Sequence, residues 1–434
     1  MQVVIGLPCA REIHRLDASV CGVPVLARVI ATALRSGGSR VLVVMPPGWS
    51  HDWLVPRLKP GPIDATCIET VDIGRVFDPN EAEDWRAIEH CLDDRFLWMP
   101  PDYLVHKRAL ADLLESARHS PGASFRFCAA DDAGQEPSPF EGPCVLLKHE
   151  QLSGARPRFR GVVKGQVGIS VRPPASIGEV EAELVRQSGK VTDGVYSRFN
   201  RMLCRPAVRW LSHTRVTPNL VTFVGLVVAV LSGLCFAHGS WVWGVAGAAL
   251  FFISGLFDEI DGMLARLKFQ ESPFGCWLET MVDYATYLLV FAGMTVGGYS
   301  QGGMLYLVLG LTVLIGLVLS FIVISIQRKL AAPPDRPNEY SRLYLAALER
   351  DRANLISRLV RQLQFLTKKG VLVHYLLLFA VLNLLPVVLF IAAFGANVAW
   401  IVTVYLNRRL FLTSKRRANR RLVARHAVPA EVEK

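Results

Sequence analysis

Apolar residues are spread unevenly along the chain. The first half mixes apolar and polar segments, whereas the second half contains long apolar stretches. A helix needs about 17 to 25 apolar residues to cross a bilayer. The stretches near that length, which predict about six transmembrane helices, are 218–237, 241–265, 280–298, 303–327, 370–392 and 396–412. Pro386 and Gly395 are the two candidate positions for the turn between the last two spans.

The first 175 residues have the pattern of a soluble α/β domain. Short apolar runs at 3–7 and 39–45 are typical of buried strands, and segment 23–35 between them has helical periodicity. The order strand, helix, strand predicts a βαβ unit and a parallel sheet. Three further segments, 85–92, 96–99 and 107–118, continue the alternation less clearly. The stretch 129–143 is rich in Asp, Gly and Pro and is expected to form a loop.

Two connecting helices are expected between this domain and the first span. Ser176 and Glu179 form a capping box at the start of a helix over 177–188. In 192–212, Arg residues alternate with apolar residues at helical spacing, as in a helix that lies in the membrane interface. The expected organisation is a soluble domain at 1–175 and connecting and interfacial helices at 176–217. A membrane domain at 218–412 and a basic tail at 413–434 follow.

The formal charge of +11 comes mainly from Lys and Arg in loops that flank the apolar segments. Segments 328–369 and 408–434 are basic, while the turns at 238–240 and 299–303 contain no Lys or Arg. Under the positive-inside rule, this predicts an integral protein of the cytoplasmic membrane with both termini in the cytoplasm. The nine cysteines form no C-x-x-C pair, so neither a zinc site nor a disulfide framework is predicted. No signal peptide is expected at the N-terminus.

Four acidic residues stand in or beside the apolar stretches: Asp258, Asp261, Glu279 and Asp283. Carboxylates at membrane depth are costly and usually functional. Offsets of three and four place each pair on one face of its helix, and the two helices are successive. Since carboxylate oxygens suit Mg²⁺ and Mn²⁺, two such faces turned together predict a metal site. The alternative is a set of structural acids at helix ends, paired with Arg266 and Lys268.

The acidic pattern resembles the signature of the CDP-alcohol phosphatidyltransferase family. The run D-x-x-D-G-x-x-A-R at 258–266 is followed by an eight-residue gap and by G-x-x-x-E-x-x-x-D at 275–283. Glu279 stands where the family has Asp, which keeps the charge but adds a methylene and so bears on metal geometry. The resemblance implies a membrane enzyme that moves a phospho-alcohol or phosphatidyl group from a CDP-activated donor to a hydroxyl acceptor, with release of CMP.

The resemblance also implies roles for individual residues. Two divalent ions, Mg²⁺ or Mn²⁺, would be held by the four acids, and Asp283 would be either a ligand or the base that deprotonates the acceptor. The donor's CDP group would contact Asn219, Thr222, Asp258, Asp261, Gly262, Ala265 and Arg266. Weaker candidates for acceptor binding are Arg198, Arg201 and Lys268. Arg198 and Arg201, with Asn200, alternatively lie among lipid headgroups.

Residues 21–44 are similar to nucleotidyltransferases of the sugar-nucleotide type, in which a Gly-Xaa-Pro turn precedes a helix and a strand. Such a fusion resembles bifunctional enzymes that combine inositol-phosphate cytidylyltransferase and di-inositol-phosphate phosphate synthase activities. A working domain needs a Gly-rich loop and a Lys that cradle the triphosphate. Here only Gly6 remains after the first strand, and no Lys precedes Gly22. We therefore expect a degenerate nucleotidyltransferase-like domain that serves as a scaffold or regulatory module.

Two other functions stay open from the sequence. A catalytically impaired membrane scaffold or regulatory protein would keep the fold with a site disabled by Glu279. A transporter would need polar residues spread through several spans, but spans three, four and six are uniformly apolar. The expected partners are a CDP-alcohol donor, a hydroxyl acceptor (polyol phosphate or lipid) and membrane lipids, with no nucleic acid; a homodimer is a possible assembly. The active site is expected to face the cytoplasm.

Overall fold

The computed structural model describes residues 1–331 and 369–404, apart from gaps at 10–11, 59–62, 64, 121, 130–139, 155–158, 166–167, 172–176, 190–193, 399 and 402–403. The chain divides into two units, which are described separately. The α/β unit comprises Met1–Lys190, Arg205–Val216 and Met263–Gln270. The helical unit comprises Val191–Cys204, Thr217–Gly262 and Glu271–Lys434.

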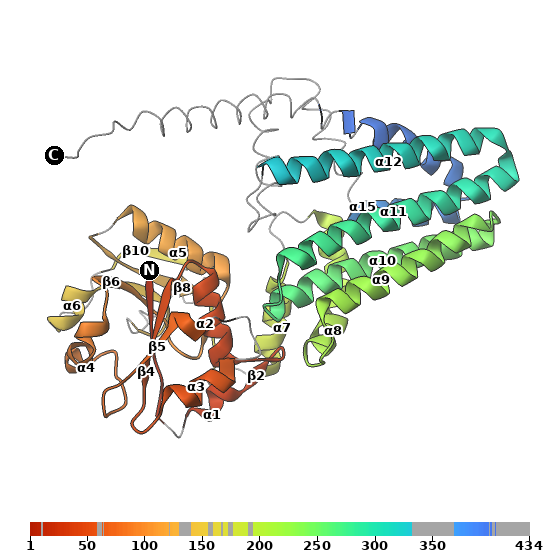
Figure 1. Ribbon diagram of the computed structural model, residues 1–434. Coiled ribbons are helices and arrows are strands. Elements are labelled where there is room, and N and C mark those ends of the chain that lie inside the picture. The colour runs from red at the N-terminus through yellow and green to blue at the C-terminus, as the bar shows by residue number, and fades with distance from the viewer. Residues whose placement is uncertain are drawn as a thin grey trace, which may run out of the picture. The chain divides into compact units, whose positions relative to one another are not determined.

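A seven-stranded sheet forms the centre of the α/β unit (Figure 1). Its order is β10-β8-β9-β6-β1-β4-β5, and only β9 runs antiparallel to its neighbours. The strands are β1 (Gln2–Gly6), β4 (Arg40–Met45), β5 (Ile68–Asp72), β6 (Arg95–Trp98), β8 (Ser124–Ala129), β9 (Cys144–Leu147) and β10 (Phe159–Gly165). Two short pairs lie outside this sheet: β2 (Ser19–Val20) with β3 (Val23–Pro24), and β7 (Tyr103–Val105) with β11 (Gly168–Ser170).

The predicted βαβ unit is confirmed. Strand β1 pairs in parallel with β4, and α2 (Val25–Arg35) connects them. Both strands are buried almost throughout, as expected for parallel strands that are covered on both faces. The helix begins two residues later than predicted because Val23–Pro24 forms β3.

Shorter helices complete the α/β unit: α1 (His14–Asp17), α3 (His51–Leu58), α4 (Ala82–Ala87), α5 (Lys107–His119), α6 (Lys148–Leu152), α7 (Ile177–Gln187), and the 3-10 turns η1 (Ala65–Cys67) and η2 (Glu89–Cys91). Helices α5 and α7 match the predicted segments 107–118 and 177–188 closely. Segment 85–92 is divided between α4 and η2. The capping residue Ser176 and most of the predicted loop 129–143 lie outside the described residues.

Aromatic side chains fill the space beside the C-terminal end of β1. Trp85 packs against Phe77 and Trp98, with ring centroids 4.9 and 5.7 Å away. Gly6, the last residue of β1, lies so close to them that a Cβ there would be 2.8 Å from the Phe77 ring. Ligands of open α/β sheets bind outside the carboxyl ends of the strands. At Gly6 that position is occupied by side chains of the protein itself.

The α/β unit also holds the end of α10 (Trp241–Leu267), the helix that carries the first half of the acidic motif. Arg28 of α2 is 4% exposed and donates hydrogen bonds to the carbonyls of Val20 (2.8 Å) and Leu267 (2.9 Å). Arg35 donates to the carbonyl of Phe269 at 2.6 Å, and both guanidinium groups stack on the Phe269 ring. Burial lowers the pKa of Arg28 to about 10, so it stays charged at neutral pH. Positive charge at a helix C-terminus is favourable.

Replacing Arg28 by Met is expected to destabilise the protein by about 2–4 kcal/mol, because two buried carbonyls lose their charged donor. The measurement is the unfolding midpoint of the full-length protein in detergent. Arg15, which forms a long 3.9 Å ion pair at the surface with Glu12, offers the control. Arg15→Met should change stability by less than about 1 kcal/mol. Equal midpoints for the two variants would contradict the anchoring role of Arg28.

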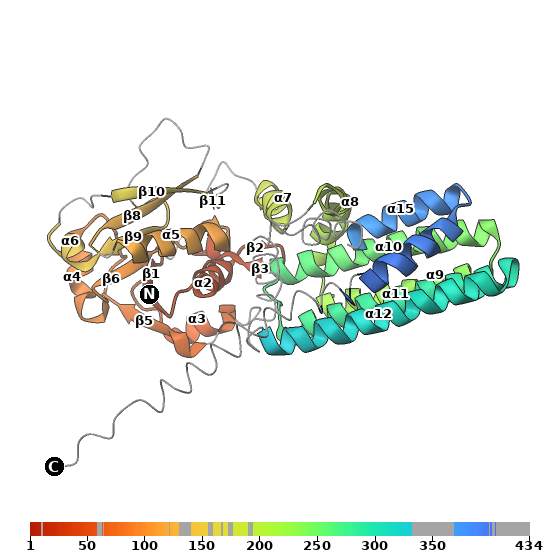
Figure 2. The same ribbon diagram turned by 90° about the horizontal axis from the view of Figure 1, so that it is seen from above.

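Among the residues described, four helices of the helical unit are long and apolar enough to cross a membrane. Figures 1 and 2 show them side by side: α9 (Pro218–Ala237), α10, α11 (Pro273–Gly302) and α12 (Met304–Ala331). They overlap the first four predicted spans. Thr217 caps α9 by accepting from the Leu220 N–H, and Pro218 occupies the first turn, where a missing N–H is harmless. The predicted interfacial helix is α8 (Val195–Ser212), whose polar and apolar residues segregate by face.

The fifth predicted span, 370–392, is interrupted in the structure. Helix α15 (Lys369–Val381) ends in a turn where Asn383 has a φ of 56°, and a second short helix covers Leu385–Val398. Asn tolerates the left-handed region better than most residues. The turn therefore falls just before Pro386 and not at Gly395, which lies inside the second helix. Most of the sixth predicted span, 396–412, lies outside the described residues.

Small residues bring α9, α10 and α11 together. A Cβ on Gly293 would lie 2.1 Å from the Gly233 carbonyl oxygen, so the backbones of α9 and α11 are in direct contact. Between α9 and α10, the hydroxyls of Ser232 and Ser254 donate to backbone carbonyls across the interface, at 2.7 and 2.9 Å. Such small and hydroxylated residues are the usual means of close helix packing in membranes. They fix the three helices that carry the acidic motif and Thr222.

Candidate active site

Asp261 is the most buried acid of the motif. It lies on α10 with 4% of its surface exposed, and the hydroxyl of Thr222 donates to its Oδ2 at 2.5 Å. Thr222 belongs to the first turns of α9, which the Thr217 cap and Pro218 start at a defined position. The hydrogen bond fixes the orientation of the carboxylate, so the two predicted donor-site residues, Thr222 and Asp261, lie together.

The two halves of the motif meet at Lys369, the first residue of α15. Its Nζ lies 2.5 Å from Oδ1 of Asp283 on α11 and 3.4 Å from Oδ1 of Asp258 on α10. The lysine side chain is 9% exposed, that of Asp258 is 23% exposed and that of Asp283 is 29% exposed. Glu279 is half-buried one turn before Asp283 on α11. The acidic faces of α10 and α11 are therefore turned toward a common position.

A second ion pair lies beside the first. Arg201 of α8 is 7% exposed and its Nε contacts Oε2 of Glu259 at 2.8 Å. Glu259 follows Asp258 directly in the motif. Asn200 is also buried, and within the described parts of the chain its Oδ1 has no hydrogen-bond partner. Arg198, by contrast, is exposed. Of the two arginines predicted as acceptor ligands, one is thus held by a carboxylate and the other is open to solvent or lipid.

Arg266 and Lys268 bind backbone carbonyls within the α/β unit. Arg266 donates to Ser188 at 2.5 Å, and Lys268 donates to Thr214 at 2.7 Å and Val216 at 3.0 Å. Lys268 is only 7% exposed, and this burial lowers its pKa. The Lys268 bonds hold the residues just before α9 against the segment just after α10, and the Arg266 bond holds the last turn of α10 against the residue that follows α7. They give both cations a structural task beside the donor- and acceptor-binding roles predicted for them.

The remaining predicted residues flank the start of α11 and the last turns of α10. Asn219 places its Oδ1 3.5 Å from where a Cβ on Gly275 would be, so the motif glycine lies against the first turn of α9. Ser272 caps α11 by accepting from the Gly275 N–H at 3.0 Å. Gly262 and Ala265 are half-buried on α10. Small residues at these places leave the backbone open to close approach.

The donor set suits a hard divalent cation. Carboxylate oxygens are what Mg²⁺ and Mn²⁺ prefer, and the Lys369 ammonium shows that a positive charge is accommodated between Asp258 and Asp283. Among the residues that the structure describes, no three His, Cys, Asp or Glu side chains already form a metal-site geometry. The residues therefore fit the charge and ligand type of the ion, while the final coordination requires some rearrangement.

Sequence reasoning missed Lys369 and the Arg201–Glu259 pair. Lys369 ends a basic segment, and nothing in that segment distinguishes it from its neighbours. Glu259 was visible inside the motif, and a partner for it could have been sought among the arginines of the interfacial helix.

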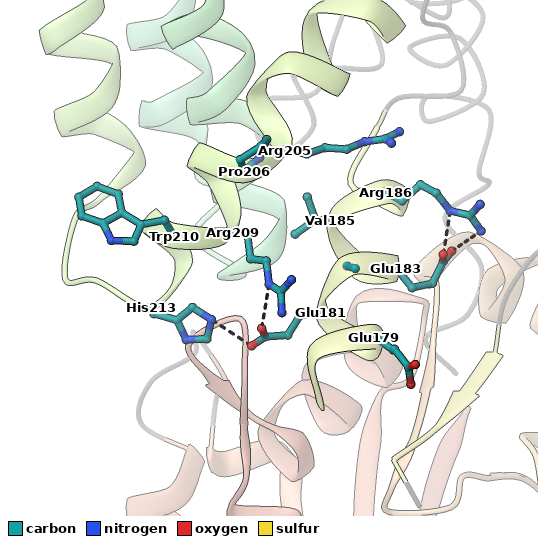
Figure 3. Close-up of a pocket in the computed structure, with 11 residues that line it drawn as sticks. Glu179, Glu181, Glu183, Val185, Arg186, Arg205, Pro206, Arg209, Trp210 and His213 are labelled. Atoms are coloured by element: carbon teal, nitrogen blue, oxygen red, sulfur yellow. Dashed lines mark hydrogen bonds and ion pairs between the residues drawn. The ribbon is translucent and has the colours of Figure 1, made fainter. Parts of the chain in front are cut away.

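A separate cavity of about 880 Å³ lies between α7 and the second half of α8, within the α/β unit (Figure 3). Glu181 forms part of its wall and is 4% exposed. It accepts from the Cys21 N–H at 3.0 Å, and Arg209 and His213 lie 3.3 and 3.0 Å from its oxygens. None of the four motif acids lines this cavity. Its charged groups therefore join α7 to α8 and are distinct from the carboxylate site.

Comparison with known proteins identifies the membrane segment. Residues 215–348 match the family model described as CDP-alcohol phosphatidyltransferase, and this range contains all four motif acids. The chain contains a CDP-alcohol phosphatidyltransferase domain. The resemblance drawn from the motif is thereby confirmed for this segment.

Relatives of this CDP-alcohol phosphatidyltransferase domain include synthases and a bifunctional protein. An archaetidylinositol phosphate synthase from Methanothermobacter thermautotrophicus is 33% identical over 82 residues, which are 19% of this chain and 40% of that protein. A phosphatidylinositol phosphate synthase from Cutibacterium acnes is 33% identical over 90 residues, 20% and 42% of the two chains. A bifunctional IPC transferase and DIPP synthase from Aquifex aeolicus is 29% identical over 123 residues, 28% of each chain. Each match spans less than half of the relative's length.

Proposed function

We propose that this protein is a membrane-embedded CDP-alcohol phosphotransferase. It transfers a phospho-alcohol or phosphatidyl group from a CDP-activated donor to a hydroxyl acceptor and releases CMP. The observation that carries the proposal is the convergence of Asp258, Asp261 and Asp283, from two apolar helices, within the segment that matches the family. Carboxylates at this depth in an apolar bundle are costly, and they usually serve a function such as binding an ion or a substrate.

The chain's own residues have distinct tasks in this reaction. Mg²⁺ or Mn²⁺, held by the four motif acids, would neutralise the diphosphate and stabilise the departing CMP. Thr222 keeps the Asp261 carboxylate in one orientation through its hydrogen bond. Asp283, 29% exposed, would be a further ligand or the base that accepts the proton of the acceptor hydroxyl. The acceptor oxygen then bonds to the phosphorus of the phospho-alcohol, and the bond from that phosphorus to the CMP oxygen breaks.

A polyol phosphate is the substrate class we favour for one side of the reaction. The names of the relatives from Methanothermobacter thermautotrophicus and Cutibacterium acnes refer to inositol phosphate lipids, which supports this choice. Exposed Arg198 is the predicted cation most available for an anionic group, because Arg201 is paired with Glu259. We further propose that the termini and the site face the cytoplasm, on the strength of the basic segments. The homodimer and the lack of nucleic-acid binding stay predictions.

The proposal is tested by CMP release. Purified full-length protein in detergent is incubated with labelled CDP-diacylglycerol or CDP-polyols, together with inositol phosphate, glycerol phosphate or lipid acceptors, with and without Mg²⁺ or Mn²⁺. We expect metal-dependent CMP release with at least one donor and acceptor pair. Absence of release with every pair, together with absence of metal-dependent CDP binding, would favour the catalytically impaired scaffold.

We also propose that the α/β unit does not make CDP-alcohols. Support comes from the missing triphosphate loop and from the aromatic side chains that fill the position beside Gly6. Full-length protein given CTP, Mg²⁺ and a sugar or polyol phosphate is expected to release no pyrophosphate above background. A working cytidylyltransferase added to the same mixture provides the positive control. Pyrophosphate release that depends on the polyol phosphate would refute this part of the proposal.

A further inference from the structure

Lys369 lies between carboxylates of α10 and α11 that are proposed to hold a divalent ion. Its ammonium contacts one oxygen of Asp283 at 2.5 Å and one of Asp258 at 3.4 Å, and its side chain is 91% buried. It comes from a third helix, α15, 86 residues after Asp283 in the chain. The contacted oxygens belong to two of the four proposed metal ligands.

An ammonium and a divalent ion are alternatives at these oxygens. The lysine headgroup is a compact point charge that neutralises the mutual repulsion of the two aspartates. A metal that uses the same oxygens must approach them to about 2.0–2.6 Å, a space the ammonium now occupies, and its charge repels the lysine. The Lys369 ammonium and a metal ion therefore cannot both bind these carboxylate oxygens in their preferred geometry at the same time.

The start of α15 is fixed, so the exchange is confined to the side chain. Gly370 packs so tightly that a Cβ there would lie 3.0 Å from the Ser197 hydroxyl of α8. The carbonyl of Gly370 is also 2.8 Å from Nδ1 of His374, whose ring packs against Tyr196 and Phe252. The backbone at Lys369 is thus anchored on α8 and α10, so the ammonium would have to leave the carboxylates by rotation about the bonds of its four methylenes.

We propose that Lys369 is an internal counter-ion that competes with the divalent cation for Asp258 and Asp283. Without metal it holds the two carboxylates together, and with metal its ammonium leaves them. This inference rests on the proposed function, because it takes the two aspartates as metal ligands. The opposite role, in which the lysine stays and organises the carboxylates for the metal, gives the opposite change in affinity when the lysine is removed.

The test measures Mn²⁺ binding to full-length protein in detergent, without nucleotide, from the electron paramagnetic resonance signal of free Mn²⁺. Lys369→Met keeps the length of the side chain and removes its charge. We expect its Mn²⁺ Kd to fall roughly tenfold or more, since close charge pairs couple by more than 1.4 kcal/mol. Its unfolding midpoint without metal should fall, and the rise on adding Mn²⁺ should exceed that of the wild type.

Two further variants control the result. Lys369→Arg keeps the charge and should bind Mn²⁺ no more tightly than the wild type. Lys148→Met removes a half-buried lysine of the α/β unit that donates to the Leu92 carbonyl, and it should leave Mn²⁺ affinity unchanged. If Lys369→Met does not fold, Lys369→Gln removes the charge while keeping a hydrogen-bond donor.

The outcomes separate this inference from the proposed function. Weaker or unchanged Mn²⁺ binding in Lys369→Met, with clear binding by the wild type, would overturn the competition and leave the proposed function intact. Absence of Mn²⁺ binding in both proteins, or binding that survives Asp258→Asn and Asp283→Asn together, would remove the metal site itself and with it both proposals.

Discussion

Replacing Asp261 by Asn is expected to lower CMP release at least roughly a hundredfold while the protein stays folded. Asn has nearly the same size, and its Oδ1 can still accept the hydrogen bond from Thr222 that the carboxylate accepts now. The negative charge is lost from a position that is 4% exposed, where little solvent can replace it. Loss of a group that only orients a metal ligand already costs about 10- to 100-fold, so loss of a proposed ligand should cost more.

The measurement is kcat/KM for CMP release, with the unfolding midpoint recorded for the same preparation. Glu271→Gln is the matched control, because Glu271 is an exposed acid that lies between the two halves of the motif. It should retain activity within about twofold, as expected for a surface change. Turnover by Asp261→Asn close to that of the control would show that the motif does not carry the chemistry.

Replacing Gly293 by Ala is expected to destabilise the helical unit by more than about 2 kcal/mol. The new methyl group would lie 2.1 Å from the Gly233 carbonyl oxygen, which is backbone and cannot rotate aside. Helices α9 and α11 would have to separate, and overpacking of this kind typically costs about 1–3 kcal/mol or more. The separation would also move Thr222 on α9 relative to Asp283 on α11, so activity should fall as well.

The checking measurement is the unfolding midpoint in detergent, compared with that of Gly395→Ala. Gly395 also lies inside an apolar helix, but a Cβ there meets no atom of the described part of the chain within 4 Å. Ala is the better helix former by about 0.8–1 kcal/mol, so this control should be neutral or slightly stabilising. Similar midpoints for the two variants would mean that the contact between α9 and α11 is looser than the structure has it.

Local pattern predicted much of the fold. The βαβ unit at β1, α2 and β4 and the first four membrane helices follow from hydrophobic periodicity and length, which depend on neighbouring residues alone. The break at Asn383 lies three residues before Pro386, one of the two expected turn positions, whereas the other, Gly395, lies inside a helix. The pattern did not show that this break interrupts the predicted span 370–392, because one polar residue in an apolar run barely changes its hydropathy.

The candidate site could be predicted only as far as its residues share a motif. Asp258, Asp261 and Asp283 are linked by fixed spacing, which anticipates that their helices face each other. Lys369 reaches them from a distant part of the chain, and no periodicity encodes that contact. The same holds for Arg28, whose partner Leu267 is 239 residues away. Long-range pairs of this kind are fixed by the packing of whole elements.

The end of α10 belongs to the α/β unit, although its acids belong to the helical unit. A shortened chain that began near the first span would therefore lack Arg28 and Arg35, and the Leu267 carbonyl and Phe269 ring would lose their cationic partners. The N-terminal half therefore contributes to the structure at the end of α10, whether or not it has any chemistry of its own.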